Sequence, residues 1–435
     1  TDKSRAYDNF SIGGKYGYKV NSKNTLSAFY QRNQASHDFS RPTENYLTQN
    51  KRTEDLAYLK LDSQITDNIT LLAKTYYHNW DTRYLRIFND TANPGNVIVK
   101  NDDDYWGYND YGVNLMTEIK GSDYLNYSFG YDYQNFSGKD DVLLIDQNNE
   151  QVQSVFAQVA SKSSWLHNTA ISVGARYNKP SGDGDKVVGQ ITAIHYLDPS
   201  LYIRTNTGTS FRLPTAYELY AIDSCCTQGN SDLEPETGLN YNLALGYSNN
   251  DLNWEIIGFK REIDNLIQGI ESSGVKTFKN TNDRVDFEGL EINISSQISS
   301  AYSLNFNHVY SSAKAEGSDK QINNIPLNHS KLNLKYRPKN KRIKLTLSAH
   351  YVGDNWDVEI SERINYGNYT FVDVTAEYSL DDQQQHWLAI TLENIIDSDY
   401  ASSVATAKRD ADNSSYVYEN RGTPFTAHLS YSYKF

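Results

Sequence analysis

The chain ends with the nine residues Ala427-His428-Leu429-Ser430-Tyr431-Ser432-Tyr433-Lys434-Phe435. Odd positions are apolar or aromatic, and even positions are mostly polar. Because successive side chains of a β-strand point to opposite faces, this pattern predicts a strand with one apolar and one polar face. An apolar face of tyrosines ending in phenylalanine suits a strand with lipid on one side and water on the other. A half-buried strand of a soluble sandwich gives the same alternation, so repetition along the chain has to decide.

The alternation recurs in many segments, among them 201–211, 302–310, 331–336 and 342–351. In the last of these, aliphatic residues alternate with arginine, lysine, threonine and histidine. A soluble core strand seldom carries so regular a charged face, whereas a water-filled barrel lumen accepts it without a desolvation cost. The repetition therefore favours a transmembrane β-barrel.

Short and long connections also take turns along the chain. Tight-turn residues occur at 66–68, 122–123, 198–200, 249–251, 299–300 and 339–340. Long polar loops are expected near 84–104, 137–149, 212–235, 314–326, 353–367 and 401–417. A meander with all short turns at one end and all long loops at the other is typical of outer-membrane barrels. We therefore predict an all-β antiparallel meander barrel of about 19 strands, forming one domain over residues 1–435.

Composition is consistent with this class and excludes others. The mean hydropathy is −0.68, and no segment approaches the roughly 20 apolar residues of a transmembrane helix. The 35 tyrosines suit an aromatic girdle, although tyrosines in loops would give the same count. The net charge of −13 argues against nucleic acid as a partner, because neutralising phosphates needs a basic surface.

The chain has two cysteines, the neighbours Cys225 and Cys226, in a predicted outer loop. A vicinal disulfide is our preferred interpretation, and two free thiols are the alternative. The nine histidines are scattered without metal-ligand spacing, and no nucleophile motif is present. The sequence therefore predicts a protein that is not an enzyme and has no cofactor of its own.

Three segments resemble TonB-dependent outer-membrane receptors of the siderophore and cobalamin type. The first pairs Phe211-Arg212-Leu213-Pro214 with Asn230-Ser231-Asp232-Leu233-Glu234-Pro235-Glu236, where Ser231 and Asp232 replace the usual Pro and Asn. The second is Phe287-Glu288-Gly289-Leu290-Glu291, in which Gly289 predicts a bulge or a close backbone approach. The third is Asn394-Ile395-Ile396-Asp397-Ser398-Asp399-Tyr400. The terminal Phe435 resembles the aromatic assembly signal that the barrel assembly machinery reads. We interpret these motifs as architecture first.

The resemblance implies a 22-stranded barrel with an N-terminal plug, and neither the plug nor a TonB box is recognisable here. The chain is therefore expected to be a C-terminal barrel portion. The missing strands would come from another polypeptide or from a further part of the gene. Alternatively, the barrel would close in a different way without them. The implied partners are TonB-ExbB-ExbD acting through the plug, outer-membrane lipid and lipopolysaccharide, and a small-molecule metal chelate. The implied location is the outer membrane of a Gram-negative bacterium.

Aromatic and arginine residues at predicted outer loops are the ligand candidates, because ring faces and guanidinium groups suit planar anionic chelates. Each could equally be a rim or girdle residue. They are Trp80, Arg83, Tyr84, Arg86, Tyr105, Trp106, Tyr108, Tyr220 and Trp356. The adjacent Asp102, Asp103 and Asp104 could hold a structural calcium ion, although a solvated acidic loop explains them as well.

The resemblance predicts an active-transport receptor for a scarce, large nutrient. Family haem transporters carry a histidine between the two boxes, and residues 213–229 contain none. A ferric siderophore is the preferred ligand, and cobalamin is the alternative within the family. A different class of protein, a plugless passive pore or a surface-binding barrel, also fits the sequence.

Overall fold

The computed structural model describes residues 6–39, 46–90, 92–182, 184–223, 227–272, 275–339, 342–359, 362–408 and 414–434. The chain forms two compact units. The first comprises Thr1–Ile191, Gly208–Thr237 and Asn265–Asn282, and the second comprises Thr192–Thr207, Gly238–Asp264 and Asp283–Phe435. Nineteen long strands belong to one sheet, which confirms the predicted all-β meander and its strand number.

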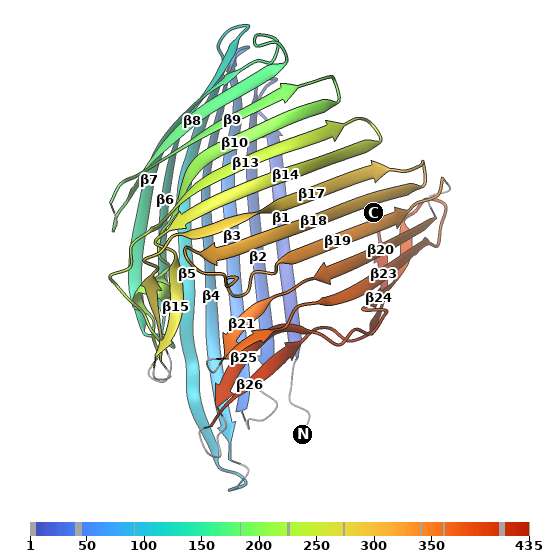
Figure 1. Ribbon diagram of the computed structural model, residues 1–435. Helices are drawn as coiled ribbons and strands as arrows, with labels where there is room; N and C mark the ends of the chain where they lie inside the picture. Colours follow the sequence, from blue (N-terminus) through green and yellow to red (C-terminus); the bar gives the residue numbers. More distant parts are fainter. Residues whose placement is uncertain are drawn as a thin grey trace. The chain divides into compact units, whose positions relative to one another are not determined.

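The first unit contains eight of the long strands. They are β1 (Tyr7–Lys19), β2 (Asn24–Phe39), β3 (Tyr46–Thr66), β4 (Ile69–Asn89), β5 (Val97–Lys120), β6 (Leu125–Asp140), β7 (Ile145–Ser161) and β8 (Thr169–Pro180). Each pairs antiparallel with the next from β1 to β8. Figure 1 shows β3, β4 and β5 as long blue strands. The residues of three further strands are divided between the units: β9 (Lys186–Tyr196), β10 (Leu201–Arg212) and β13 (Glu236–Ser248).

The second unit continues the meander with shorter strands. They are β14 (Leu252–Asp264), β17 (Val285–Gln297), β18 (Tyr302–Ala315), β19 (Asn328–Tyr336), β20 (Ile343–Val352), β23 (Tyr369–Ser379), β24 (His386–Glu393) and β27 (Thr426–Tyr433). Each of these is antiparallel to its neighbour in this series. The terminal strand is thus a strand, as its alternation predicts.

Side-chain hydrogen bonds close the tight turns as the sequence predicts. Asp198 Oδ1 accepts the backbone N–H groups of Ser200 and Leu201 at 2.7 and 2.9 Å. Asn249 Oδ1 does the same for Asp251 and Leu252 at 2.9 and 2.7 Å. These short polar side chains replace the backbone partners that a reversing chain loses. The end of each hairpin opposite these turns is called the outer end below.

The prediction of a long loop is wrong in two segments. The segment 84–104 is mostly strand, because β4 runs to Asn89 and β5 begins at Val97. The segment 137–149 is likewise divided between β6 and β7, with only residues 141–144 between them. Aromatic and β-branched residues in the first segment favour extended backbone even where charged residues interrupt them. The outer end of this unit is therefore built from long strands.

Other outer connections carry small structures of their own. A four-stranded sheet in the first unit combines β11 (Ile222–Asp223), β12 (Thr227–Gln228), β15 (Ile267–Ser272) and β16 (Val275–Asn280), preceded by helix α1 (Ala216–Tyr220). The second unit has two hairpins, β21 (Trp356–Glu359) with β22 (Glu362–Asn365) and β25 (Ala401–Lys408) with β26 (Ser415–Arg421). The sequence did not predict α1 or the β15–β16 hairpin.

The long strands have two different faces. One face of β27 exposes Leu429 (71%) and Tyr431 (58%), and its register aligns them with Ile390 and Leu388 of β24. Gly289 shows why a glycine was required on the polar face of β17: a Cβ there would lie 2.0 Å from the Tyr310 carbonyl oxygen. The register across β17 is unbroken, so the close approach is confirmed and the alternative of a bulge is not. Among the described residues, no helix is long and apolar enough to cross a membrane.

Candidate functional site

Three aromatic side chains predicted as ligand contacts come together on the polar face of β4 and β5. The register pairs Trp80 with Tyr108 and Thr82 with Trp106, so these side chains share a face. The Trp80 ring centroid lies 6.0 Å from that of Trp106 and 6.3 Å from that of Tyr108. Arg52 of β3 places Cζ 4.7 Å from the Trp80 centroid and donates from Nε to Thr82 Oγ1 at 3.2 Å. This aromatic cluster (Arg52, Trp80, Trp106, Tyr108) presents ring faces beside a cation.

Charged and amide side chains adjoin the aromatic cluster. Glu54 of β3 accepts a hydrogen bond from Asn33 Nδ2 at 2.9 Å, and its other oxygen lies 2.9 Å from His78 Nε2. The His78 ring meets the Tyr108 ring edge-on at 6.0 Å. Sequence reasoning missed Arg52, Glu54 and His78. Their place on the polar face of β3 and β4 could have been read from the alternation, but their pairing with the tryptophans depends on the register.

Two polar atoms near this cluster are buried without a partner among the described residues. They are Trp106 Nε1 and Asn50 Oδ1. Asn50 lies on β3, two residues from Arg52 and opposite Tyr84. Folded proteins leave few buried donors and acceptors unpaired, because each costs roughly 1–3 kcal/mol. A purely structural role does not explain the unpaired indole N–H, and we treat this part of the polar face as the candidate ligand site.

The remaining predicted ligand residues do not all join the cluster. Tyr84 and Arg86 lie on the same face of β4, farther toward the outer end, and Arg86 Cζ stacks 4.2 Å from the Tyr46 ring centroid. Arg83 and Tyr105 are paired with each other on the opposite, apolar face. Two more candidates lie on other elements: Tyr220 ends α1, and Trp356 lies in β21 of the second unit under the Arg363 guanidinium.

The predicted calcium ligands are part of β5. Asp104 accepts a hydrogen bond from Asn101 Nδ2 at 2.7 Å, and an Asp103 oxygen lies 3.6 Å from Arg83 Nη1. Across the described part of the chain, no group of three or more histidine, cysteine or acidic side chains is arranged to hold a metal ion. Calcium binding by Asp102, Asp103 and Asp104 remains a prediction. Cys225, Cys226 and Phe435 lie outside the described residues, so the vicinal disulfide and the assembly signal remain predictions too.

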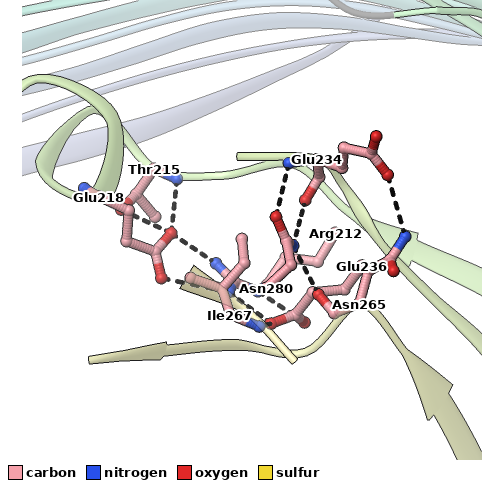
Figure 2. A network of polar contacts seen from close by, with 8 residues as sticks. All are labelled: Arg212, Thr215, Glu218, Glu234, Glu236, Asn265, Ile267 and Asn280. Atoms are coloured by element: carbon pink, nitrogen blue, oxygen red, sulfur yellow. Dashed lines mark hydrogen bonds and ion pairs between the residues drawn. The ribbon is translucent and has the colours of Figure 1, made fainter. Parts of the chain in front are cut away.

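The first sequence motif forms a compact charge network, shown in Figure 2. Arg212, the last residue of β10, is bidentate to two carboxylates. Its Nε and Nη2 donate to Glu236 at 2.9 and 2.6 Å, and its Nη1 and Nη2 donate to Glu218 at 2.9 and 3.2 Å. Glu236 Oε1 also accepts the backbone N–H of Ile267 at 2.8 Å. The Arg212 cluster (Arg212, Thr215, Glu218, Glu236, Ile267) thus ties residues of both motif boxes to β15.

Helix α1 begins where the sequence dictates. Thr215 is the N-cap: its Oγ1 accepts the Glu218 N–H at 3.2 Å, and Glu218 Oε2 accepts the Thr215 N–H at 2.8 Å, which completes a capping box. Burial raises the pKa of Glu218, but hydrogen bonds from Arg212 and Thr215 outweigh burial and hold that pKa below its ordinary value. Glu218 is therefore held as a carboxylate by the same groups that start the helix.

A small apolar core and amide hydrogen bonds hold the same two connections together. Leu233, Ile267 and Phe278 are buried against one another. Asn280 Nδ2 donates to the carbonyl oxygens of Glu234 and Asn265, both at 2.8 Å. Figure 2 shows Asn280 between these two residues. The described residues of the connections 213–235 and 265–282 therefore form one folded body within the first unit.

The third motif forms a second network, in the second unit. Asn394 is 1% exposed; its Nδ2 donates to the carbonyl oxygens of Ser398 and Thr423 at 2.9 and 3.0 Å, and its Oδ1 accepts the Ser398 N–H at 2.9 Å. Asp397 Oδ1 accepts the Phe425 N–H at 3.1 Å. Asn394 and Asp397 both have positive φ, which asparagine and aspartate tolerate better than most residues. The Asn394 cluster (Asn394, Asp397, Ser398, Thr423, Phe425) anchors both ends of the β24–β27 connection.

The motif's last residue, Tyr400, has a packing role. Its ring stacks on Tyr369 and Phe371, with centroids 4.4 and 5.3 Å away, and Phe371 stacks on His350 at 4.6 Å. A Cβ on Gly422 would lie 2.0 Å from the Tyr400 ring, so only glycine leaves space for it. The motifs are therefore architectural, as the sequence analysis inferred.

Two-faced strands, tight turns and elaborated outer connections, with these clusters at the motif positions, define a β-barrel of the bacterial outer membrane. The chain belongs to the TonB dependent receptor-like, beta-barrel family, whose model matches residues 1–395. Barrels of this family lie in the Gram-negative outer membrane and are receptors rather than enzymes. The predicted family and location are confirmed.

Relatives agree on the fold and differ in ligand. The vitamin B12 transporter BtuB of Photobacterium profundum is 29% identical over 218 residues, 49% of this chain and 34% of that protein. The match thus spans about a third of the relative's length. Among solved structures, the siderophore receptor PirA from Acinetobacter baumannii has a TM-score of 0.77 at 14% identity, covering 99% of this chain and 71% of that one. The FrpB iron transporter of Neisseria meningitidis (F3-3 variant) has a TM-score of 0.76 at 12% identity, covering 99% of this chain and 72% of that one.

Proposed function

We propose that this chain forms the ligand-contacting wall of an outer-membrane active-transport receptor that takes up a ferric siderophore of the catecholate type, driven through TonB. The aromatic cluster is the observation that carries the proposal. A ferric catecholate is a large anion with planar aromatic rings, and Arg52 with Trp80, Trp106 and Tyr108 offers a cation and ring faces side by side.

Binding can be measured by quenching of tryptophan fluorescence with a ferric tris-catecholate siderophore added to the detergent-purified protein. Replacement W80A should weaken binding about 10-fold, because it removes the ring that lies under the Arg52 guanidinium and meets Trp106 edge to face. The matched control is W165A, because Trp165 lies in the tight turn 162–168 at the opposite end of the strands. Equal binding by W80A and W165A would contradict the proposed site.

Energy coupling needs a separate test in cells. Uptake of the radioactive iron chelate by cells that produce the protein should stop when TonB is deleted, while binding at the cell surface persists. Uptake that continues without TonB would contradict active transport and support a passive pore.

Cobalamin is the second candidate ligand, favoured by the 29% identity to a vitamin B12 transporter over 218 residues. The same fluorescence titration with cyanocobalamin discriminates the two. Tight binding of cyanocobalamin that W80A leaves unchanged, with no binding of the ferric chelate, would replace the siderophore proposal.

A further inference from the structure

The polar face of β2–β4 carries a second group of aromatic rings, nearer the tight turns than the aromatic cluster. The register pairs Phe29 with Tyr58 and Tyr58 with Tyr76, so three rings stand side by side on neighbouring strands of the first unit. Phe29 and Tyr58 are stacked, with their centroids 5.1 Å apart and their planes 18° from parallel. Tyr76 lies four residues from Trp80 along β4 and therefore shares its face. Both groups of rings thus belong to the same polar surface.

Lys74 of β4 lies over two of these rings. Its Nζ is 5.4 Å from the Tyr58 centroid and 5.5 Å from the Tyr76 centroid. The Tyr76 ring is held in place, because its hydroxyl donates to Asp110 Oδ1 at 3.1 Å and a Cβ on Gly112 would lie only 2.8 Å from the ring. The two ring faces therefore hold the ammonium group at a defined position. The four residues Phe29, Tyr58, Lys74 and Tyr76 are called the lysine site below.

The positive charge of Lys74 has no carboxylate of its own. Lys60, directly opposite on β3, places its Nζ 2.8 Å from Asp62 Oδ1. Arg176 of β8 likewise forms an ion pair with Asp132. In the described parts of the chain, no hydrogen bond or ion pair reaches the Lys74 ammonium group. Because this side chain is also exposed, a negatively charged ligand can approach it without displacing a protein carboxylate.

The lysine site repeats the chemistry of the aromatic cluster. In the aromatic cluster, the Arg52 guanidinium lies over the ring of Trp80. In the lysine site, the Lys74 ammonium lies over the rings of two tyrosines. Trp80 and Lys74 are six residues apart on β4, which is roughly 20 Å along an extended strand. A small chelate does not span that distance, so the two places can each hold a ligand molecule.

We propose that the lysine site is a second binding site for an anionic chelate with planar aromatic rings. The proposal rests on the function proposed above, because the aromatic cluster defines the ligand class. The rings of the lysine site offer stacking to catecholate rings, and Lys74 offers the counter-charge. The tight turn between β3 and β4 follows Thr66, so the lysine site is nearer the turn end than Trp80 is. A ligand that moves along these strands from the outer end meets the aromatic cluster first and the lysine site second.

Equilibrium dialysis of the detergent-purified protein against a ferric tris-catecholate siderophore labelled with radioactive iron counts the sites. The wild-type protein should bind two equivalents. K74Q should weaken one of them about 5-fold, because it removes the charge that faces the anion, and W80A should weaken the other. K74R should keep wild-type binding, since a guanidinium also lies well over ring faces. The matched control is K120Q, because Lys120 is exposed on the same polar face at the turn end of β5.

The outcomes separate this proposal from the function on which it rests. A single equivalent that W80A weakens and K74Q leaves unchanged would overturn the second site and leave the proposed function intact. Equal effects of K74Q and K120Q would also overturn the second site. Absence of any binding would contradict both proposals. Heat-modifiable migration on gels shows that each variant is folded before binding is measured.

Discussion

The Arg212 cluster and the Asn394 cluster anchor long outer connections by different chemistry. In the first unit, one guanidinium is shared by two carboxylates, which also accept the backbone N–H groups of Thr215 and Ile267. In the second unit, one neutral amide bonds only to backbone groups, those of Ser398 and Thr423. Both are sequence motifs of one family, yet only the first is built around ion pairs between its members.

The difference predicts how each connection opens. A charge network loses strength when one member is neutralised, and its half-exposed arginine is screened by solvent. An amide buried at 1% exposure cannot be replaced without leaving backbone groups unpaired. We therefore expect the amide cluster to be the more costly to break and the charge cluster to be the one that acid weakens.

The largest effect is expected for N394A. Removal of the amide leaves two carbonyl oxygens and one N–H without partners in a buried place, at a cost of about 3 kcal/mol in local stability. Hydrogen exchange of residues 395–400 and 421–425 measures it. N394D is the graded control, because it keeps the acceptor for Ser398 N–H and loses the two donor bonds. A change no larger than that of R212M would contradict the ranking.

A smaller loss, about 2 kcal/mol, is expected for R212M, which leaves Glu218 and Glu236 without their counter-charge. Because Arg212 joins both connections, exchange should rise in 213–223 and in 265–272 together. R204M is the matched control, because Arg204 also pairs with a carboxylate but joins no outer connections. Its Nη2 lies 2.8 Å from each carboxylate oxygen of Glu255. If only one of the two segments responds, the connections are not one body.

The third test concerns the stack of aromatic rings around Tyr400, where we expect a loss of local stability of about 1–2 kcal/mol. In G422A, the new methyl group overlaps the Tyr400 ring, which must leave Tyr369 and Phe371. The overlap disappears in Y400A/G422A, so the two effects should be strongly non-additive in a double-mutant cycle. Hydrogen exchange of residues 414–426 reports the change. If the effects of G422A and Y400A on hydrogen exchange simply add, Gly422 is not required to leave space for the Tyr400 ring.

Much of the fold could be predicted from the sequence, because alternation and turn residues are local signals. The terminal strand and the turns at Asp198 and Asn249 follow from them directly. The outer parts of β4 and β5 could not, because charged residues in a strand beyond the lipid resemble a polar loop. Helix α1 has five residues, too few to show helical periodicity.

The candidate site was predictable in composition and not in arrangement. Trp80, Trp106 and Tyr108 were identified as ligand candidates, and the structure brings them together. The sequence analysis grouped Arg83 with these residues, but Arg83 lies on the other face of β4. Side chains alternate along a strand: Arg83 is six residues from the lipid-facing Tyr77 and shares its face, whereas Trp80 is three residues away and lies on the opposite face. The contribution of Arg52 depends on the register between β3 and β4, which no local pattern encodes.

The smallest expected effect is a pH dependence of the Arg212 cluster that the Asn394 amide does not share. The pKa of Glu218 lies below its ordinary value in the folded state, so the unfolded connection binds the proton more readily. The carboxylate therefore stabilises α1 above the ordinary pKa of a glutamate, and this contribution, about 1 kcal/mol, is lost as pH falls through the lower folded-state pKa. Limited proteolysis of residues 213–223 along an acid titration measures it. E218Q should be cleaved faster at neutral pH and show a flatter dependence on acid, because it has no proton to gain. The Asn394 amide gains no proton either. A titration of E218Q as steep as that of the wild type would therefore assign the acid sensitivity to a group other than Glu218.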